Sequence, residues 1–135
     1  MRLAYSYTTF KYSGATLSTN KVKAKEGLEV TVTITNTGKR AGRETVQVYI
    51  HDVKSSLQRP PKELKAFTKT KLLDPGASEA VKVLLDHISL GYFDDHPDAN
   101  KWVAEEGMFK VYIGPTSEKV SAELEFELTE TYSWI

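Results

Sequence analysis

The 135-residue chain contains no cysteine. Disulfide bonds, thiolate metal sites and cysteine nucleophiles are therefore excluded from its chemistry. The absence of cysteine is compatible with a reducing compartment such as the cytoplasm. It does not identify the compartment, because a chain of this length can bury a core that is stable without disulfide bonds.

The chain also lacks an excess of charge of either sign, because its 18 basic and 18 acidic residues cancel. A surface for nucleic acid or an anionic membrane needs a basic excess, so we expect neither partner. The apolar runs are too short to span a membrane, and the opening residues MRLAYSYTTF lack the apolar centre of a signal peptide. With 40% hydrophobic residues, the composition is that of a globular protein, and we expect residues 1–135 to form a single domain.

What the chain does have is an alternation of apolar and polar residues with a period of two, the pattern of strands with one buried face. In residues 28–36, for example, Leu28, Val30, Val32 and Ile34 alternate with glutamate and threonines. Similar segments predict about seven strands, within residues 10–18, 28–38, 44–52, 64–72, 78–86, 107–114 and 121–129.

The segments between these strands are rich in turn-forming residues. Glycine or proline occurs in residues 36–42, 74–76, 105–107 and 114–118, where the chain must reverse. Short alternating strands with frequent turns predict an all-β fold, an antiparallel β-sandwich. The only helical candidate is a connector of a turn or two in residues 86–95, where Ile88, Leu90 and Phe93 are spaced as on a helix.

One loop has part of the spacing of a calcium-binding loop. Its candidate ligands, at positions 1, 3, 5, 7 and 12 of that pattern, are Asp94, His96, Asp98, Asn100 and Glu105. Ala99 stands where the sharp turn of such a loop requires glycine, and histidine is a poor calcium ligand. We therefore favour an exposed acidic loop and expect no metal site and no cofactor.

No catalytic constellation is recognisable in the sequence. The three histidines, His51, His87 and His96, are not at metal-ligand spacing, and no nucleophile elbow, paired carboxylates or phosphate-binding glycine loop is present. In residues 122–128, Glu123, Glu125 and Glu127 alternate with apolar residues, which predicts the solvated face of a strand. We therefore expect no catalytic residues in this chain.

Aromatic residues gather at both ends of the chain. Aromatic faces can stack on sugars, so an independent carbohydrate-binding module is one alternative function. The other interpretation is that these side chains pack under an edge strand or against a neighbouring domain. The residues concerned are Tyr5, Tyr7, Phe10, Tyr12, Tyr132 and Trp134.

The least ordinary segment is HDVKSSLQRPPKELKAF, residues 51–67, which joins two predicted strands without a glycine. Pro60 and Pro61 favour an extended backbone and lack two hydrogen-bond donors, so this part cannot lie in a central strand. A stiff arm loses little entropy on docking and can present Arg59, Lys62 and Glu63 at a fixed place. We expect Arg59–Glu63 to contact another domain or a substrate entrance. The alternative is a crossover between the two sheets.

Five segments of the sequence occur in one order and at close spacing, and together they resemble those of a known family. They are SYTTFKYS (6–13), VTVTITNTGKRAGRETVQVYIHD (30–52), RPPKELKAF (59–67), LDPGASEAVKVLLD (73–86) and GMFKVYIG (107–114). The chain resembles the C-terminal fibronectin type III-like domain of family 3 glycoside hydrolases, the β-glucosidase and β-xylosidase group. It departs from that family at the start, where MRLAYSYT replaces a glycine-rich entry similar to FGYGLSYT.

This resemblance implies a fibronectin type III-like, immunoglobulin-like sandwich and a parent enzyme that hydrolyses terminal β-linked sugars with retention. It also implies that the catalytic carboxylates lie on upstream domains of the parent chain. We therefore expect a non-catalytic accessory module that packs against those catalytic domains, with carbohydrate as a further candidate partner. A dimerisation or adhesion module is the remaining alternative.

Overall fold

The computed structural model describes residues 8–24, 26–53, 63–86, 90–94, 100–116 and 118–134. Among these residues no helix is long and apolar enough to cross a membrane. The strands are β1 (Phe10–Leu17), β2 (Lys21–Val22), β3 (Leu28–Asn36), β4 (Thr45–Asp52), β5 (Glu63–Lys69), β6 (Ser78–Leu85), β7 (Tyr92–Asp94), β8 (Lys101–Ala104), β9 (Gly107–Gly114), β10 (Ala122–Leu128) and β11 (Tyr132–Trp134).

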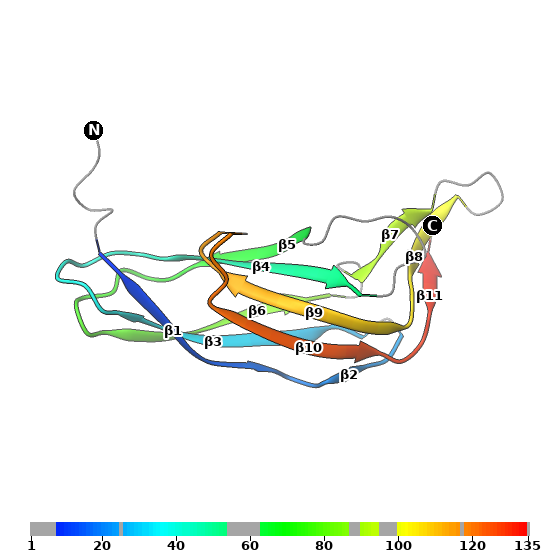
Figure 1. Ribbon diagram of the computed structural model, residues 1–135, viewed down its shortest axis with the longest axis horizontal. Coiled ribbons are helices and arrows are strands. Elements are labelled where there is room, and N and C mark those ends of the chain that lie inside the picture. Colours follow the sequence, from blue (N-terminus) through cyan, green and yellow to red (C-terminus); the bar gives the residue numbers. More distant parts are fainter. Residues whose placement is uncertain are drawn as a thin grey trace.

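Two sheets lie face to face and enclose one apolar core (Figure 1). The smaller sheet has the order β1-β3-β6, and the larger sheet has the order β2-β10-β9-β4-β5. Paired apolar residues fill the space between the sheets. Phe109 and Phe126, for example, are opposite each other on β9 and β10, and their rings stack with centroids 5.2 Å apart.

The predicted all-β sandwich is confirmed, and each of the seven predicted strands is present. The predicted faces are also confirmed, most clearly in β3, where every second residue from Leu28 to Asn36 is buried. The period of two identifies these strands because successive side chains of a strand point to opposite faces of the sheet.

A third, small sheet with the order β11-β8-β7 lies at one end of the sandwich (Figure 1). Its strands are three or four residues long, too short to show a period. The prediction of a helical connector in residues 86–95 is wrong at Tyr92–Asp94, which form β7 and pair with β8. The backbone there is held by cross-strand pairing, which the local sequence does not reveal. Residues 87–89 and 95 lie outside the described residues.

The larger sheet has a further short strand, β2, at the edge opposite β5. It pairs in parallel with β10, with Lys21 opposite Glu127 and Val22 opposite Leu128. The other strand pairs of the two sheets are antiparallel, as predicted, and β2–β10 is the one parallel pair among the described strands. Val22 is fully buried, so this edge is closed by apolar packing as well as by hydrogen bonds.

β4 and β5 are antiparallel neighbours in the larger sheet, with Thr45 opposite Lys69 and Ile50 opposite Glu63. The alternative of a crossover between the two sheets is therefore wrong, because residues 53–62 connect adjacent strands of one sheet. Among the described strands, β5 forms one edge of that sheet, and β2 forms the other. An edge position agrees with the two prolines that precede it, since proline is confined to sheet edges.

Asn36, at the end of β3, connects three chain segments at the end of the sandwich away from the small sheet β11-β8-β7 (Figure 1). Its buried amide nitrogen donates to the carbonyl oxygens of Arg40 and Leu73, at 2.7 and 2.8 Å. Its amide oxygen accepts from the Thr8 hydroxyl and the Gly38 backbone N–H. Every hydrogen-bonding group of this fully buried amide is satisfied, as buried polar groups require. One side chain thereby joins the start of β1, the β3–β4 loop and the approach to β6.

Candidate functional site

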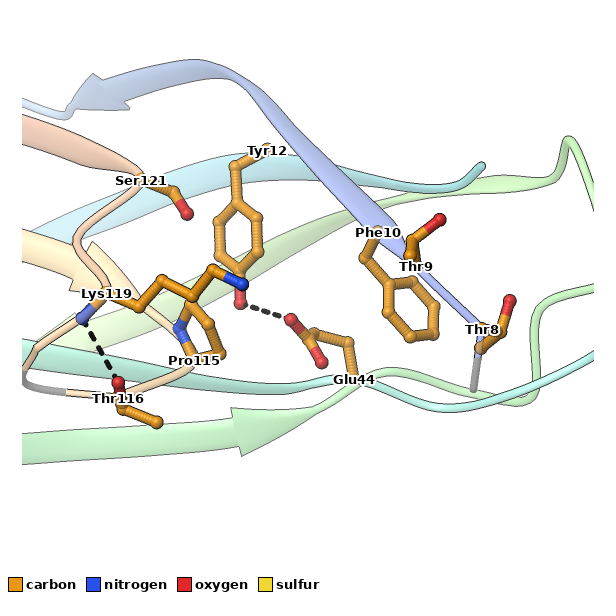
Figure 2. Close-up of a pocket in the computed structure, with 9 residues that line it drawn as sticks. All are labelled: Thr8, Thr9, Phe10, Tyr12, Glu44, Pro115, Thr116, Lys119 and Ser121. Carbon is orange, nitrogen blue, oxygen red and sulfur yellow. Dashed lines mark hydrogen bonds between the residues drawn. The ribbon is translucent and has the colours of Figure 1, made fainter. Parts of the chain in front are cut away.

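A pocket of about 300 Å³ opens between the two sheets, where the edge strand β1 passes the connection between β9 and β10 (Figure 2). We call it the β1 pocket. One wall comes from the start of β1, another from Glu44, just before β4, and a third from four residues between β9 and β10. Its lining residues are Thr8, Thr9, Phe10, Tyr12, Glu44, Pro115, Thr116, Lys119 and Ser121.

Inside the pocket, the Tyr12 hydroxyl donates a hydrogen bond of 2.8 Å to Glu44 Oε2 (Figure 2). Burial raises the pKa of the Glu44 carboxyl above its ordinary value, although the hydrogen bond from Tyr12 and the charge of Lys119 act to lower it. Burial, with the hydrogen bond to Glu44, raises the pKa of Tyr12 far above that of a free phenol, so Tyr12 stays the donor. Tyr12 and Glu44 thus form a hydrogen-bonded donor–acceptor pair inside the pocket.

The backbone of Glu44 is anchored on both sides. Its N–H donates to the hydroxyl of Thr70 at 3.0 Å, and its carbonyl oxygen accepts from the N–H of Thr70 at 2.9 Å. Thr70 is 1% exposed. The carboxylate therefore projects from a rigid backbone position.

Lys119 reaches the pocket because the chain turns sharply after β9. The Ser121 N–H donates to the carbonyl oxygen of Ile113, and the Lys119 N–H donates to the Thr116 hydroxyl at 3.1 Å. Gly114 permits this turn, since a Cβ atom there would lie 2.3 Å from the Lys119 carbonyl oxygen. The Lys119 side chain then extends toward Tyr12 and Glu44 (Figure 2).

The start of β1 is held against the β3–β4 loop, which fixes the outer rim of the pocket. A Cβ atom on Gly38 would lie 2.2 Å from Thr8 Oγ1 and 2.8 Å from the Thr9 nitrogen, so only glycine allows this approach. The Thr9 and Thr37 hydroxyls add a hydrogen bond of 2.8 Å. The rim is therefore built from the close packing of two backbone segments.

The aromatic residues near the two ends of the sequence lie in two different parts of the structure. Phe10 and Tyr12 line the β1 pocket. Tyr132 is 7% exposed and packs beside Trp134, which stacks on Trp102 with ring centroids 6.3 Å apart. Burial and the charge of Asp86 raise the pKa of Tyr132 to about 12. Within the described residues, Tyr132 and Trp134 thus contact each other, and Trp134 contacts Trp102 in the small sheet. Tyr5 and Tyr7 lie outside the described residues.

Of the predicted contact segment Arg59–Glu63, residues 59–62 lie outside the described residues. Glu63 begins β5, and its carboxylate lies 3.8 Å from the Lys65 ammonium. Further along β5, Leu64 and Phe67 are 48% and 69% exposed. They are opposite Tyr49 and Gln47, so they lie on the outer face of the larger sheet. Two exposed apolar side chains thus lie on the strand that begins with Glu63.

The possible calcium loop falls mainly on residues 95–99, which lie outside the described residues. Within the part of the chain that the structure describes, no three histidine, aspartate or glutamate side chains are grouped as a metal would require. Asn100 has a φ of 45°, and Glu105 has partners within the protein.

Sequence reasoning did not find the β1 pocket as a site. Glu44, Lys119 and Ser121 carry no motif, and they lie far from Tyr12 along the chain. The signals available locally were the aromatic residues of β1 and the glycine–proline turn after β9, neither of which indicates a partner across the sandwich.

A family model described as a fibronectin type III-like domain matches residues 44–117, which is more than half of the chain. The chain belongs to this family. The resemblance inferred from its sequence segments is thereby confirmed, and the sandwich described above is the fold of this fibronectin type III-like domain.

The domain is similar to parts of larger β-glucosidases. Beta-glucosidase BoGH3A of Bacteroides ovatus is 42% identical over 122 residues, which cover 90% of this chain and 16% of the relative. Thermostable beta-glucosidase B of Acetivibrio thermocellus is 39% identical over 115 residues, covering 85% of this chain and 15% of the relative. The chain spans about one sixth of the length of these curated relatives.

Solved structures show the same relation. Beta-glucosidase 3B of Thermotoga neapolitana, determined in complex with glucose, is 38% identical with a TM-score of 0.85. The match covers 95% of this chain and 17% of that one. A GH3 beta-glucosidase of Bifidobacterium adolescentis gives a TM-score of 0.80 at 31% identity, covering 90% of this chain and 17% of the other.

Proposed function

We propose that residues 1–135 act as one non-catalytic accessory module of a family 3 glycoside hydrolase of the β-glucosidase or β-xylosidase type. The observation that carries this proposal is the asymmetry of coverage. The relatives match up to 96% of this chain, whereas the chain matches 15 to 17% of each relative. A domain with this relation to glycosidases is expected to work alongside catalytic domains in one polypeptide.

The first test is the size of the cellular polypeptide. An antibody against this chain should detect, by immunoblotting of the native source, a protein several times larger than 15.2 kDa. A free polypeptide of about the size of the isolated chain would contradict the proposal.

The module's task in this proposal is to pack against the catalytic domains through the edge of the larger sheet. The contact surface would begin with Arg59, Pro60, Pro61, Lys62 and Glu63 and continue along the outer face of β5 through Leu64 and Phe67. Exposed apolar side chains gathered at a sheet edge are typical of an interface. A free edge strand also needs to be covered if it is not to pair with other chains.

Phe67→Ser tests this surface, with Leu84→Ser as its matched control. Both side chains are strongly exposed, at 69% and 66%, but Leu84 lies on β6 in the smaller sheet. In the isolated chain each change should alter the free energy of unfolding by no more than about 0.5 kcal/mol. In the full-length enzyme only Phe67→Ser should lower the melting temperature or raise KM, and Arg59→Ala should act in the same direction.

Equal behaviour of Phe67→Ser and Leu84→Ser in the full-length enzyme would contradict docking through β5. Sedimentation of the isolated chain tests the alternative of a dimerisation module. We expect a monomer, because the proposed partner of the β5 surface is another domain of the same polypeptide. A dimer abolished by Phe67→Ser would assign that surface to self-association instead.

A further inference from the structure

The β1 pocket contains hydrogen-bonding groups that the described part of the protein does not use. Lys119 makes no ion pair with any described residue, and the Ser121 hydroxyl makes no hydrogen bond there. The Glu44 carboxylate accepts only the hydrogen bond from Tyr12 among these residues. A carboxylate, an ammonium and a hydroxyl thus line one cavity of about 300 Å³, and each can form further hydrogen bonds.

The charges in the pocket oppose each other. Glu44 contributes one negative charge and Lys119 one positive charge, and the two interact, since Lys119 lowers the pKa of Glu44. An anion would be repelled by Glu44 and a cation by Lys119, so a neutral ligand is favoured over either. A purely apolar ligand is disfavoured as well, because it would remove water from both charges without replacing their hydrogen bonds.

The shape and lining indicate the class of this neutral ligand. Phe10 offers an aromatic surface in the same cavity as the polar groups (Figure 2). A pyranose ring carries apolar C–H faces, which pack on aromatic rings, and equatorial hydroxyls, which can donate to a carboxylate and accept from an ammonium. A volume of about 300 Å³ lies at the small end of ligand pockets, in the range suited to one sugar ring.

We propose that the β1 pocket binds one pyranose ring of a neutral saccharide. Glu44 Oε1 accepts from one hydroxyl of the sugar, and Lys119 Nζ and Ser121 Oγ donate to others. Tyr12 is a positioning residue, because its hydrogen bond holds Glu44 Oε2 and leaves Oε1 directed to the ligand. In the larger sheet, β5 pairs with one side of β4 and β9 with the other. Sugar binding in the β1 pocket therefore does not require the docking surface on β5.

The proposal can be tested on the 135-residue chain by titrating it with glucose, cellobiose and xylobiose and recording amide chemical shifts. We expect saturable, millimolar binding to at least one of these sugars, with the largest shifts at residues 8–12, 44 and 115–121. Acetate and glycine serve as charged probes and should give no saturable shifts in these residues.

Lys119→Met removes the ammonium and keeps most of the side-chain length. It should weaken binding about tenfold, since a hydrogen bond from a charged donor is lost. Lys82→Met makes the same chemical change at an exposed position of β6 and should leave the affinity unchanged. Glu44→Gln keeps an acceptor for Tyr12 and should weaken binding less than Lys119→Met does.

The proposal would be overturned if none of the three sugars gave saturable shifts, if the shifts were confined to the Trp102–Trp134 region, or if the Lys119→Met and Lys82→Met variants had equal affinity. Preference for acetate or glycine would also overturn it. Failure here leaves the accessory role intact, because that role is tested by the size of the cellular polypeptide and by Phe67→Ser.

Discussion

Glu44 illustrates how much a single side chain depends on contacts that are distant in sequence. Its backbone N–H donates to Thr70, its carboxylate accepts from Tyr12, and Lys119 lines the same pocket. These three residues come from different parts of the chain. The energetic consequence is a carboxyl group whose ionised form is less favourable in the folded protein than in the unfolded chain, because burial dominates the shift in its pKa. Polar residues at ligand sites commonly carry such a cost in stability.

The pH dependence of stability should reveal this cost. Because the folded-state pKa of Glu44 is raised, its protonation stabilises the folded state below the unfolded value of 4.5, and this contribution is lost as pH rises through the folded-state pKa. Glu44→Gln, which cannot ionise, should therefore be more stable than wild type at pH 7. The difference should shrink below pH 4.5.

Thermal unfolding of both proteins across this pH range provides the measurement. Other carboxylates titrate alike in the two proteins and cancel in the difference. An advantage of Glu44→Gln that grows as the pH falls would show that the sign of the shift is wrong.

At the scale of elements, the small sheet β11-β8-β7 shows how short strands are stabilised by their side chains. Trp134 is opposite Trp102 across the β8–β11 pair, and the two rings stack at an angle of 11°. Trp134 also covers Gly91, where a Cβ atom would lie 2.5 Å from the indole ring. Trp134 thus contacts Trp102 on β8, Gly91 just before β7 and Tyr132 on its own strand.

Replacing this tryptophan should cost more than replacing its partner. Trp134→Ala should lower the free energy of unfolding by about 3 kcal/mol, because it leaves a cavity above Gly91 and beside Tyr132. Trp102→Ala loses the same stacking contact but removes a side chain that is 40% exposed, so its cost should be clearly smaller. Equilibrium denaturation of both variants compares the two values, and equal costs would contradict the central role of Trp134.

At the scale of the whole molecule, the packing of the two sheets places a single carboxylate, that of Glu44, among the lining residues of the β1 pocket. Retaining glycosidases need a pair of carboxyl groups about 5 Å apart on either side of the sugar bond. Glu44 is the only carboxylate among the residues lining the β1 pocket. A sugar ring bound as proposed would therefore not meet, among the described lining residues, the second carboxyl group that hydrolysis requires.

The isolated chain should therefore show no turnover of aryl β-glucosides or β-xylosides. Release of the aryl group, followed by absorbance, should stay at the rate of a buffer blank. Turnover by the purified chain that disappears in Glu44→Gln would place a catalytic group in this domain and contradict the accessory role.

The main features of the fold could be predicted from the sequence because they are encoded locally. Alternation in segments such as Leu28–Asn36 and Gly107–Gly114 specifies both a strand and its buried face. The terminal strand β11 could not be predicted in this way. Three residues show no period, and Tyr132–Trp134 become a strand only because β8 lies beside them.

Sequence alone determined the class of fold, the seven long strands, the family and the absence of cysteine chemistry. The tertiary structure alone decided that β5 lies beside β4 at an edge of the larger sheet, and that Tyr12, Glu44 and Lys119 share a pocket. The physical reason is the range of the interactions. Strand periodicity repeats between neighbours along the chain, whereas the pocket joins β1, the residue before β4 and the turn after β9, which meet only when the two sheets pack.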